Sequence, residues 1–252
     1  MTGIVILTAV ELEAWGLARE LELRPLPRAP YPCFEGTLAA GRLVVAPMGL
    51  GARFLPDRWP ALAAEFSPDL VISGGTCGAL DPSLNVGDLV LAREVLTPRG
   101  NSLPVSSGVV EVLARAATAA GSLARLGTLL CAEKVMTSPE AKSERWHATG
   151  AIAVDLESGP ILEFARRRGL SAGVIRGVSD SADQPLAPEL LDLVTPAGGL
   201  RPGRALGLAL TRPRVLSQAL ALRRGASRAM RAVARLLGRL CMPASVHAPE
   251  VE

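Results

Sequence analysis

The amino-acid sequence predicts a single α/β domain in which helices cover both faces of a mixed, twisted β-sheet, a three-layer α/β/α architecture. Three observations support this prediction. Short apolar runs rich in Val, Ile and Leu alternate with helix-length segments along most of the chain. The 252 residues are enough for one large α/β domain with a sizeable core. Hydrophobic residues make up 49% of the chain and aromatic residues only 3%, so the core should be aliphatic.

Seven segments have the length and composition of β-strands. They are residues 4–7, 43–47, 70–73, 88–92, 127–131, 152–154 and 173–178. Residues 33–39 are separated from the 43–47 run by a short Ala-Gly-Arg turn, so these two segments should form a hairpin. Because the strands of a hairpin pair antiparallel, whereas strands joined through a helix can pair in parallel, we expect a mixed sheet.

Helices are expected at residues 11–23, 54–66, 109–120, 139–148 and 156–168, followed by a long C-terminal helix. Pro160 falls in the first turn of its helix, where the missing N–H costs little. Residues 98–104 and 181–188 are expected to be loops. No internal repeat or low-complexity linker divides the chain. We therefore expect one domain over residues 1–240, with a basic helical part at 193–240, and a tail at 241–252.

The composition predicts neither a metal centre nor a disulfide framework, and no cofactor is expected. The four cysteines are widely scattered, form no CxxC pair and are accompanied by only two histidines. Glu11 follows the first apolar run at once and no basic region precedes that run, so the N-terminus predicts a strand rather than a signal peptide. No apolar stretch approaches the ~20 residues of a membrane-spanning helix. We therefore expect a cytoplasmic protein.

Two consecutive predicted strands end in carboxylates. The first is followed by Asp155-Leu-Glu-Ser158, and the second runs through Val174-Ile-Arg-Gly-Val-Ser-Asp-Ser-Ala-Asp183. In an open α/β sheet, ligands bind beyond the carboxyl ends of the strands. The pattern therefore indicates a site for a polyhydroxylated ligand and an acid–base reaction. Taken alone, Asp180 fits a helix N-cap equally well, and Glu157 fits a first-turn acid that meets the helix dipole.

The glycine-rich segment Val71-Ile-Ser-Gly-Gly-Thr-Cys-Gly-Ala-Leu80 matches neither common nucleotide-binding loop. It lacks the Gly-Lys-Ser/Thr of a P-loop. A Rossmann loop runs directly into a helix, whereas Asp81-Pro82 here precedes a new strand, which disfavours a dinucleotide oxidoreductase. Two interpretations remain. One is a tight turn with close packing, and the other is a pocket wall in which Gly75 exposes the backbone and Thr76 offers a hydroxyl.

Together these segments resemble the purine nucleoside phosphorylase/nucleosidase superfamily. The matches run from residue 4 to about residue 183, in the same order and spacing as in the family. They comprise Thr8-Ala-Val-Glu-Leu-Glu13, Ser73-Gly-Gly-Thr-Cys-Gly-Ala79, Val86-Gly-Asp88, Ala153-Val-Asp-Leu-Glu-Ser158 and Arg176-Gly-Val-Ser-Asp-Ser-Ala-Asp183. The start looks like the methylthioadenosine/adenosylhomocysteine nucleosidases. The C-terminal part looks like the hopanoid-associated phosphorylases, on the strength of Gly150-Ala-Ile-Ala-Val-Asp-Leu-Glu-Ser158 and of residues 208–222 around Arg212-Pro213.

The resemblance implies cleavage of the N-glycosidic bond of a purine nucleoside or of a nucleoside-bearing derivative such as adenosylhopane. It assigns Asp180 to protonating the purine, Glu157 to the ribose hydroxyls and Glu13 to positioning an attacking water. Where adenosine-type nucleosidases stack a Phe on the base, this chain has Val135 beside Met136. Family members usually assemble, so a homo-oligomer is also implied. The further implied substrate contacts are Gly75, Thr76, Leu156 and Ser179.

The proposed reaction needs these residue types. A purine leaves poorly as an anion, so a carboxylic acid close to its nitrogen removes that difficulty, and positioned acid–base groups contribute roughly 10²–10⁴-fold. A carboxylate that accepts both ribose hydroxyls orients the sugar and favours the positive charge that develops on it. The alternative is a non-catalytic nucleoside-binding or scaffolding protein on the same fold. Binding alone, however, needs no acid for the leaving group.

The sequence leaves open whether phosphate or water accepts the ribosyl group, and what the 5′ substituent is. Hexameric phosphorylases carry a Gly-Asp-Pro-x-Arg phosphate loop after the first strand and an Arg before the glycine segment. In this chain, Thr8-Ala-Val-Glu-Leu-Glu13 stands where those enzymes have the phosphate loop, and Ser73 stands where they have the Arg. Without those arginines, a phosphate loses its bidentate partners. Gly51 and Arg53 offer a substitute phosphate site, since a helix N-terminus and one Arg can hold an anion.

The C-terminal part of the chain is strongly basic. Ten arginines and no acidic residue lie between Leu193 and Pro249, although the net charge of the whole chain is only +3. Five of them recur every three or four residues opposite apolar side chains, which predicts a basic amphipathic helix. One interpretation is a docked helix with a solvated face, and the other is peripheral contact with anionic lipid. Nucleic-acid binding is not expected, because no aromatic residues are interleaved for stacking. The five are Arg224, Arg228, Arg231, Arg235 and Arg239.

Overall fold

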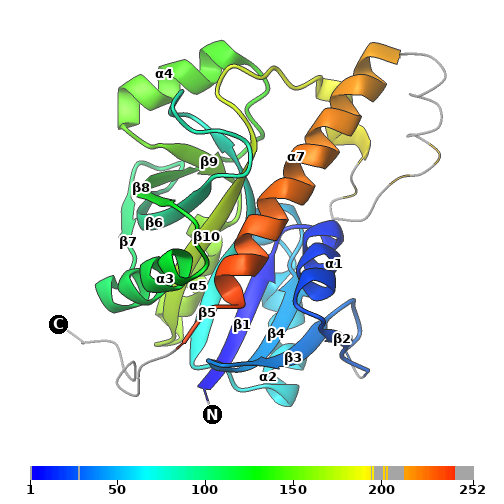
Figure 1. Cartoon of the computed structure of the whole chain (residues 1–252), viewed down its shortest axis with the longest axis vertical. Coiled ribbons are helices and arrows are strands. Elements are labelled where there is room, and N and C mark those ends of the chain that lie inside the picture. The colour runs from blue at the N-terminus through cyan, green and yellow to red at the C-terminus, as the bar shows by residue number, and fades with distance from the viewer. Residues whose placement is uncertain are drawn as a thin grey trace.

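The computed structural model describes residues 2–27, 29–193, 195, 201, 203 and 213–241. Within these residues, ten strands form one mixed sheet, and helices lie on both of its faces (Figure 1). This confirms the predicted three-layer α/β fold. Part of the predicted basic segment (194, 196–200, 202 and 204–212) and nearly all of the predicted tail (242–252) lie outside the described residues.

One half of the sheet is open. β1 (Thr2–Thr8) pairs in parallel with β4 (Gly41–Pro47) on one side and with β5 (Leu70–Ala79) on the other. β3 (Phe34–Leu38) pairs antiparallel with β4, which confirms the predicted hairpin. The short strand β2 (Arg24–Pro25) extends the edge next to β3. This half therefore follows the predicted strands closely.

The other half of the sheet closes into a ring. β10 (Ser171–Asp180) pairs in parallel with β5 and antiparallel with β6 (Leu89–Leu96), and β6 pairs with β8 (Ala124–Cys131). β8 pairs with β9 (Ala153–Asp155), which returns antiparallel to the last residues of β5. Because β5 is ten residues long, its first part pairs with β1 and its last part pairs with β9. β5 is thus the strand shared by the open half and the ring.

Two layers of helices cover the sheet (Figure 1). α1 (Glu11–Glu20), α3 (Ser107–Ala119) and α7 (Pro213–Leu237) pack against the face that carries Ile4 and Ile6 of β1. α2 (Leu55–Glu65) and α5 (Ser158–Arg167) pack against the face that carries Val5 and Leu7. The alternation along β1 follows from the two-residue period of a strand. α4 (Pro139–Thr149) follows β8, and two 3₁₀ turns lie at Leu50–Ala52 and Pro188–Leu193.

Several predicted boundaries were wrong for identifiable reasons. The glycine-rich segment is not a turn, because its backbone continues β5 between β9 and β10. The predicted 98–104 loop contains the short strand β7 (Ser102–Pro104), which pairs with β6. The first helix ends at Glu20, since Glu22 has a positive φ of 54° that ends helical geometry before β2. The hairpin turn precedes Gly41, which already pairs with Leu38.

α7 packs directly on the backbone of β10 because two glycines leave no side chain between them. A Cβ atom on Gly177 would lie 2.6 Å from the carbonyl oxygen of Ala229 in α7. A Cβ atom on Gly225 of α7 would lie 2.1 Å from the carbonyl oxygen of Ser179. Both distances are shorter than any van der Waals contact. The helix therefore supports the end of the strand that carries Asp180.

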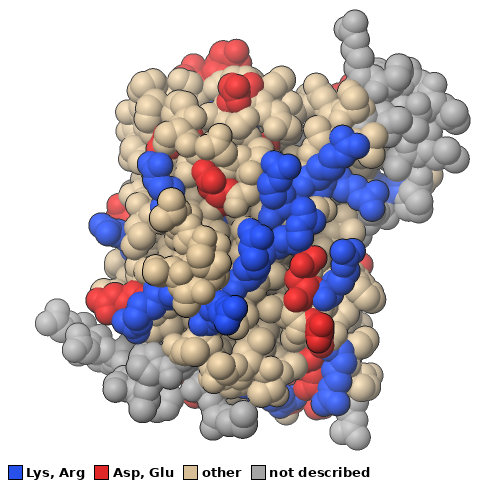
Figure 2. All heavy atoms as spheres, viewed as in Figure 1, with Lys and Arg blue, Asp and Glu red and all other residues tan. Residues whose placement is uncertain are grey.

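The arginines of the C-terminal helix form a continuous basic band on the surface, visible as blue spheres along α7 (Figure 2). The opposite side of the helix is buried in the core through side chains such as Val233 and Leu236. This confirms the amphipathic helix predicted from the sequence. Among the residues that the structure describes, none of the helices combines the length with the hydropathy that a membrane-spanning helix requires. The basic band consists of five exposed residues of α7, Arg223, Arg224, Arg228, Arg231 and Arg235, and of Arg239, which is exposed two residues beyond the end of the helix.

We predict that Gly177→Ala destabilises the protein by forcing α7 away from β10. Overpacking a well-filled core costs about 1–3 kcal/mol, and backbone atoms cannot rotate aside as side chains do. Thermal unfolding should show a lower Tm. Gly108→Ala in α3 is the control, because the nearest atom to a Cβ there is 4.0 Å away and Ala favours a helix. Equal Tm values for the two variants would contradict the proposed backbone contact.

Candidate active site

Glu13 lies at the start of α1 with its carboxylate in a cradle of hydrogen-bond donors. Its Oε2 accepts hydrogen bonds from the backbone N–H of Ala9 at 3.0 Å and of Val10 at 3.3 Å. Its Oε1 accepts from the backbone N–H and the hydroxyl of Thr76, both at 2.8 Å. Ala9 and Val10 follow β1 and Thr76 belongs to β5, so the pairing of these strands builds the cradle. The four donors use the four lone-pair sites of the carboxylate.

Gly75 allows two charged side chains to approach the same point of β5. A Cβ atom there would lie 2.6 Å from Nη1 of Arg176 and 2.9 Å and 3.0 Å from the carboxylate oxygens of Glu13. Any larger residue would displace one of the two groups. The glycine therefore permits close packing of two of the protein's own side chains on the backbone. That a ligand also lies against this segment stays a prediction.

Arg176 is fully buried among three buried carboxylates, those of Glu13, Asp155 and Glu157, which we call the acidic cluster. Its Nη2 forms an ion pair with Asp155 and lies 3.8 Å from Oε2 of Glu157. The same nitrogen donates to the hydroxyl of Ser73 at 2.7 Å. Its Nε and Nη1 have no hydrogen-bond partner among the described residues. Because unpaired buried donors are costly, these two nitrogens are available to a ligand in the site.

Glu157 is buried immediately before the first residue of α5. Its Oε1 accepts a hydrogen bond from the backbone N–H of Gly51 at 3.0 Å, and its side chain does not cap α5. Burial raises the pKa of Glu157 to about 7; the charge of Arg176 lowers this pKa, and those of Asp155 and Glu13 raise it further. Glu157 therefore changes its charge near neutral pH.

Asp180 is the last residue of β10 and is also buried. Its Oδ1 accepts a hydrogen bond from the hydroxyl of Ser179 at 2.7 Å, and its Oδ2 accepts one from Nζ of Lys142 at 2.6 Å. Lys142 lies on α4 and is fully buried. The interpretation of Asp180 as a helix N-cap is wrong, because this residue lies within a strand and a loop follows it.

Asp180 and the acidic cluster meet across β5. A Cβ atom on Gly78 would lie 3.0 Å from Oδ2 of Asp180. Thr76, which binds Glu13, is only two residues earlier in a strand that rises about 3.3 Å per residue. β9 runs antiparallel to β5, so the chain that leaves β9 passes back along β5 with Asp155 and Glu157. The sequence suggested that the acids lie together at the carboxyl ends of parallel strands. This expectation was wrong, because β9 runs antiparallel to β5. The acids converge because the ring closes on β5.

The remaining predicted site residues lie in three different environments. Leu156 is half-buried between β9 and α5, next to Glu157. Arg53 is exposed, and in the described part of the chain no ion pair ties it to the acidic cluster. Met136 packs at the edge of a small hydrophobic cluster that includes Leu80 and Leu130, whereas the side chain of Val135 is 37% exposed. The contact of these two side chains with a base stays a prediction.

Sequence reasoning missed three residues that complete this site. Asp155 was visible in the motif but had no assigned role. Arg176 carried a signal that was not used, because an Arg inside the apolar run of residues 174–178 predicts a buried charge that needs partners. Lys142 lies on an otherwise polar helix and is brought to Asp180 only by the tertiary fold. No spacing rule in the sequence connects these two residues.

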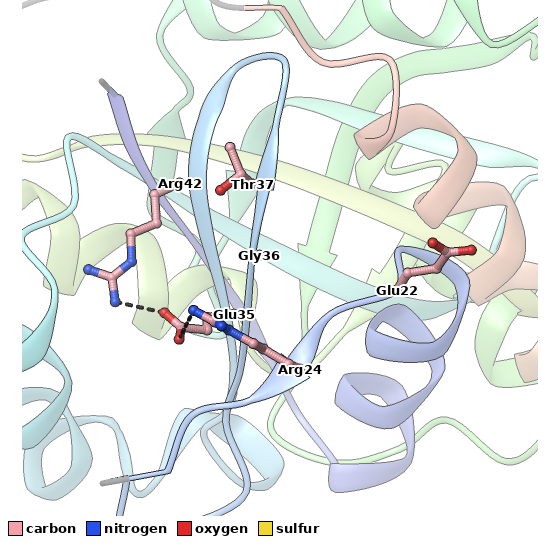
Figure 3. A pocket seen from close by; sticks show the side chains of 6 residues that line it. All are labelled: Glu22, Arg24, Glu35, Gly36, Thr37 and Arg42. Carbon is pink, nitrogen blue, oxygen red and sulfur yellow. Dashed lines mark hydrogen bonds and ion pairs between the residues drawn. The ribbon is translucent and has the colours of Figure 1, made fainter.

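A cavity of about 440 Å³ lies at the β2–β4 edge of the sheet (Figure 3). None of its lining residues belongs to the acidic cluster. Glu35 lies in it between Arg24 and Arg42, at 3.2 Å and 2.8 Å, and a hydrogen bond from Arg42 holds the pKa of Glu35 below its usual range. These charges satisfy one another at an exposed edge. We therefore assign the cavity no catalytic role. Its lining residues are Glu22, Arg24, Glu35, Gly36, Thr37 and Arg42.

Comparisons with known proteins agree with this architecture. The 5'-methylthioadenosine/S-adenosylhomocysteine nucleosidase of Staphylococcus aureus (strain MRSA252) is 26% identical over 198 residues, which cover 71% of this chain and 87% of that protein. The structure of the Neisseria meningitidis enzyme of the same name, in complex with methylthio-immucillin-A, is 23% identical with a TM-score of 0.68, covering 94% of this chain and 99% of that one. Futalosine hydrolase of Helicobacter pylori is 16% identical with a TM-score of 0.70, covering 95% and 97%. A family model described as "Phosphorylase superfamily" matches residues 3–206, so this chain belongs to the phosphorylase superfamily.

Proposed function

We propose that this protein hydrolyses the N-glycosidic bond of a purine nucleoside and releases the free base and the free sugar. The observation that carries this proposal is the cradle around Glu13. The backbone N–H groups of Ala9, Val10 and Thr76 would suit an anion such as phosphate, but the protein's own carboxylate already occupies them. A phosphate would have to displace a buried carboxylate from four donors, whereas a water molecule would not.

The charge of the site also favours water over phosphate. Three buried carboxylates surround Arg176, which is the one buried arginine among the described residues. At an effective dielectric constant near 20, a unit negative charge about 4 Å from a carboxylate costs about 4 kcal/mol. Gly51 already donates its N–H to Glu157, and the Arg53 side chain is exposed, so the substitute phosphate site finds no support. The names of the relatives, nucleosidase and hydrolase, agree with this choice.

The proposed reaction assigns one task to each carboxylate. Ionised Glu157 accepts the ribose hydroxyls and stabilises the positive charge that develops on the sugar. Glu13 holds the water and takes its proton once the Thr76 hydroxyl rotates away and frees a lone pair. Nη1 of Arg176 faces the same point of β5 and donates to that water. The C1′–N bond breaks as the water oxygen bonds to C1′, and the base takes a proton from Asp180.

The substrate is proposed to be an adenosine-type nucleoside with a substituent at the 5′ carbon. The base would rest on Val135 and Met136, with Ser179 beside Asp180 and with the backbone of Gly75 and Leu156 lining the sugar. The names of the relatives describe nucleosides with 5′ substituents, which supports this class. The homo-oligomer implied by the resemblance stays a prediction.

We also propose that the basic band recruits the protein to anionic membranes, which would give access to a lipid-linked nucleoside such as adenosylhopane. Like charges three and four residues apart on a helix repel one another. α7 nevertheless carries no acidic residue, and none of the arginines of the band forms an ion pair within the described part of the chain. An anionic surface would relieve this repulsion, and each Arg near such a surface contributes about 1 kcal/mol.

The first prediction of this proposal is base release that does not depend on phosphate. Adenine should be released from adenosine or from 5′-substituted adenosines at the same rate with and without phosphate, and the sugar product should be unphosphorylated. Asp180→Asn should lower kcat by roughly 10²-fold or more while ligand is still bound. Asp183→Asn, an exposed acid three residues later, is the matched control. Formation of a sugar 1-phosphate would refute hydrolysis, and unchanged turnover of Asp180→Asn would remove that residue from the mechanism.

The raised pKa of Glu157 predicts a pH dependence. Below about pH 7 this residue is protonated, so kcat/KM should fall about tenfold per pH unit as the pH decreases. Because the folded-state pKa lies above the unfolded value, the stability that Glu157 contributes is present at low pH and is lost as the pH rises through about 7. Glu157→Gln should therefore gain Tm relative to the parent protein mainly above that pH. Glu163→Gln, at an exposed position in α5, should leave both profiles unchanged. If kcat/KM of the parent protein does not fall below about pH 7, this assignment of Glu157 is contradicted.

The membrane proposal predicts binding to vesicles that contain anionic phospholipid and not to neutral vesicles. Replacing Arg231, Arg235 and Arg239 with Gln should weaken binding roughly 100-fold, from about 1 kcal/mol for each charge, and added salt should weaken it further. Replacing three exposed arginines elsewhere removes the same charge and should have a smaller effect. Co-sedimentation that is independent of anionic lipid would rule the proposal out. The control arginines are Arg93, Arg99 and Arg166.

A further inference from the structure

Lys142 is an unusual residue in this chain. Of the 27 basic residues only two are lysines, Lys134 and Lys142, and all the others are arginines. Lys134 is exposed, whereas Lys142 is fully buried. A buried charge is costly without partners, so its position needs an explanation beyond solubility.

The surroundings of Lys142 supply acceptors for its three ammonium protons. Nζ donates to Oδ2 of Asp180 at 2.6 Å, to the carbonyl oxygen of Ser181 at 2.7 Å and to that of Gln184 at 3.4 Å. All three acceptors belong to the end of β10 and the loop that follows it. α4 therefore contacts the proposed leaving-group acid through one fully enclosed ion pair.

Both oxygens of Asp180 accept hydrogen bonds, one from Lys142 and one from the Ser179 hydroxyl. An ammonium group that donates to a carboxylate favours the ionised form of that carboxylate. An ionised Asp180 has no proton for a purine. The transferable proton of this pair is therefore on Lys142 in the resting protein.

Building on the proposed function, we propose that Lys142 supplies, through Asp180, the proton that the departing purine takes up. As the C1′–N bond breaks, its electron pair moves to the purine. The proton of Lys142 moves to the Asp180 carboxylate, and Asp180 passes a proton on to the purine. The pair is left as a carboxylate and a neutral amine. Solvent returns a proton to Lys142 after the base leaves, and the proton of the attacking water leaves through Glu13. Lys142 is thus a positioning residue that acts through Asp180.

The identity of the basic residue fits this role. A guanidinium group stays protonated in proteins, whereas an ammonium group can give up a proton when it is buried. An Arg at position 142 would neutralise Asp180 but could not pass a proton to it. Almost all other basic residues of this chain are Arg. The Lys at position 142 therefore fits a group that must release a proton.

Few other titratable groups act on this pair. Cys77 of β5 interacts electrostatically with Asp180, but burial raises the pKa of this thiol far above its usual range, so it stays neutral. Asp183 accepts a hydrogen bond from the Ser181 hydroxyl at the exposed side of the loop. On α7, Gly225 packs against the Ser179 carbonyl, and on β9, Val154 lies beside Gly78; neither residue is titratable. Among the described residues, Asp180 is therefore the one ion-pair partner of Lys142.

The pH profile of base release tests this proposal. In the parent protein the pair keeps a transferable proton until Lys142 itself deprotonates, so the rate should hold into the alkaline range. In Lys142→Met, Asp180 must hold that proton alone, so the alkaline fall in kcat should move to lower pH. Below the fall the rate should approach that of the parent. A merely structural role would lower the rate by one factor at every pH. Arg145→Met removes a charge from the exposed side of the same helix and is the matched control.

A second substrate separates proton supply from any other effect of the substitution. A 4-nitrophenyl riboside has a leaving group that departs without being protonated. Lys142→Met and Asp180→Asn should both lose at least roughly 10²-fold at alkaline pH with the purine nucleoside and little with the nitrophenyl riboside. The double variant should lose no more than the stronger single variant, because the two groups act as one unit. Equal losses on both substrates would overturn the proposal.

The two lysines allow a measurement that does not depend on activity. Protein labelled with ¹³C at the lysine ε carbons should give two signals, and the one missing from Lys142→Met belongs to Lys142. That signal should titrate at a lower pH in Asp180→Asn than in the parent protein. Identical titrations would overturn the pairing of Lys142 with Asp180. If Lys142→Met fails to fold, Lys134→Arg identifies the two signals instead, because Lys134 lies in an exposed loop and its signal is then the one that disappears.

The outcomes distinguish this inference from the function on which it rests. If the parent protein releases base and Lys142→Met retains its pH profile, the role of Lys142 is wrong and the nucleosidase proposal stands. If the parent protein releases no base from any nucleoside, the nucleosidase proposal is wrong and proton supply by Lys142 is wrong with it. If the alkaline fall in kcat of Lys142→Met moves to lower pH, and if the loss of rate is large only with the purine substrate, both the role of Lys142 and the nucleosidase proposal are supported.

Discussion

The buried guanidinium of Arg176 is the interaction on which the arrangement of the site depends. Glu13 comes from the start of the chain, whereas Asp155 and Glu157 are two residues apart between β9 and α5. Each of these acids would be strongly unfavourable in the core as an isolated charge. Arg176 lies among all three and pairs directly with Asp155. Removing one partner of such a pair leaves an uncompensated buried charge, which is far more costly than losing a surface ion pair. Folding of β10 and ordering of the site are therefore coupled.

Closure of the ring around β5 brings these charges together. β5 pairs with β1, β10 and β9, and the side chains that follow or belong to those strands reach the same few residues of its glycine segment. Glycines at 75 and 78 leave room for Glu13, Arg176 and Asp180 beside the backbone. The segment therefore acts as the floor of the site without contributing a charge of its own. A chemically varied set of groups fits into a small volume because the strand between them has few side chains.

Much of the fold was predictable from local pattern. Apolar runs located the strands at residues 4–7, 43–47 and 70–73, and the two-residue alternation of β1 is reflected in the two hydrophobic layers. Local pattern failed where tertiary pairing decided the backbone. The glycine segment has the composition of a turn, yet it is a strand, because β9 and β10 supply hydrogen-bond partners on its two sides. A strand of low intrinsic propensity persists when neighbouring strands satisfy its backbone.

The order of residues along the chain is sufficient to show which positions carry charge and which segments are apolar, and the family resemblance added a role for Asp180, Glu157 and Glu13. Which of these charges meet depends on the three-dimensional fold. In the fold, Asp180 pairs with the buried Lys142, and Asp155 pairs with Arg176. The Glu13 carboxylate accepts the hydrogen bonds of the backbone N–H groups that would otherwise suit an anion. Electrostatic interactions act through space and depend on burial, whereas sequence patterns report on neighbours within one helix or strand. For that reason the acids were readable from the sequence, but their partners were not.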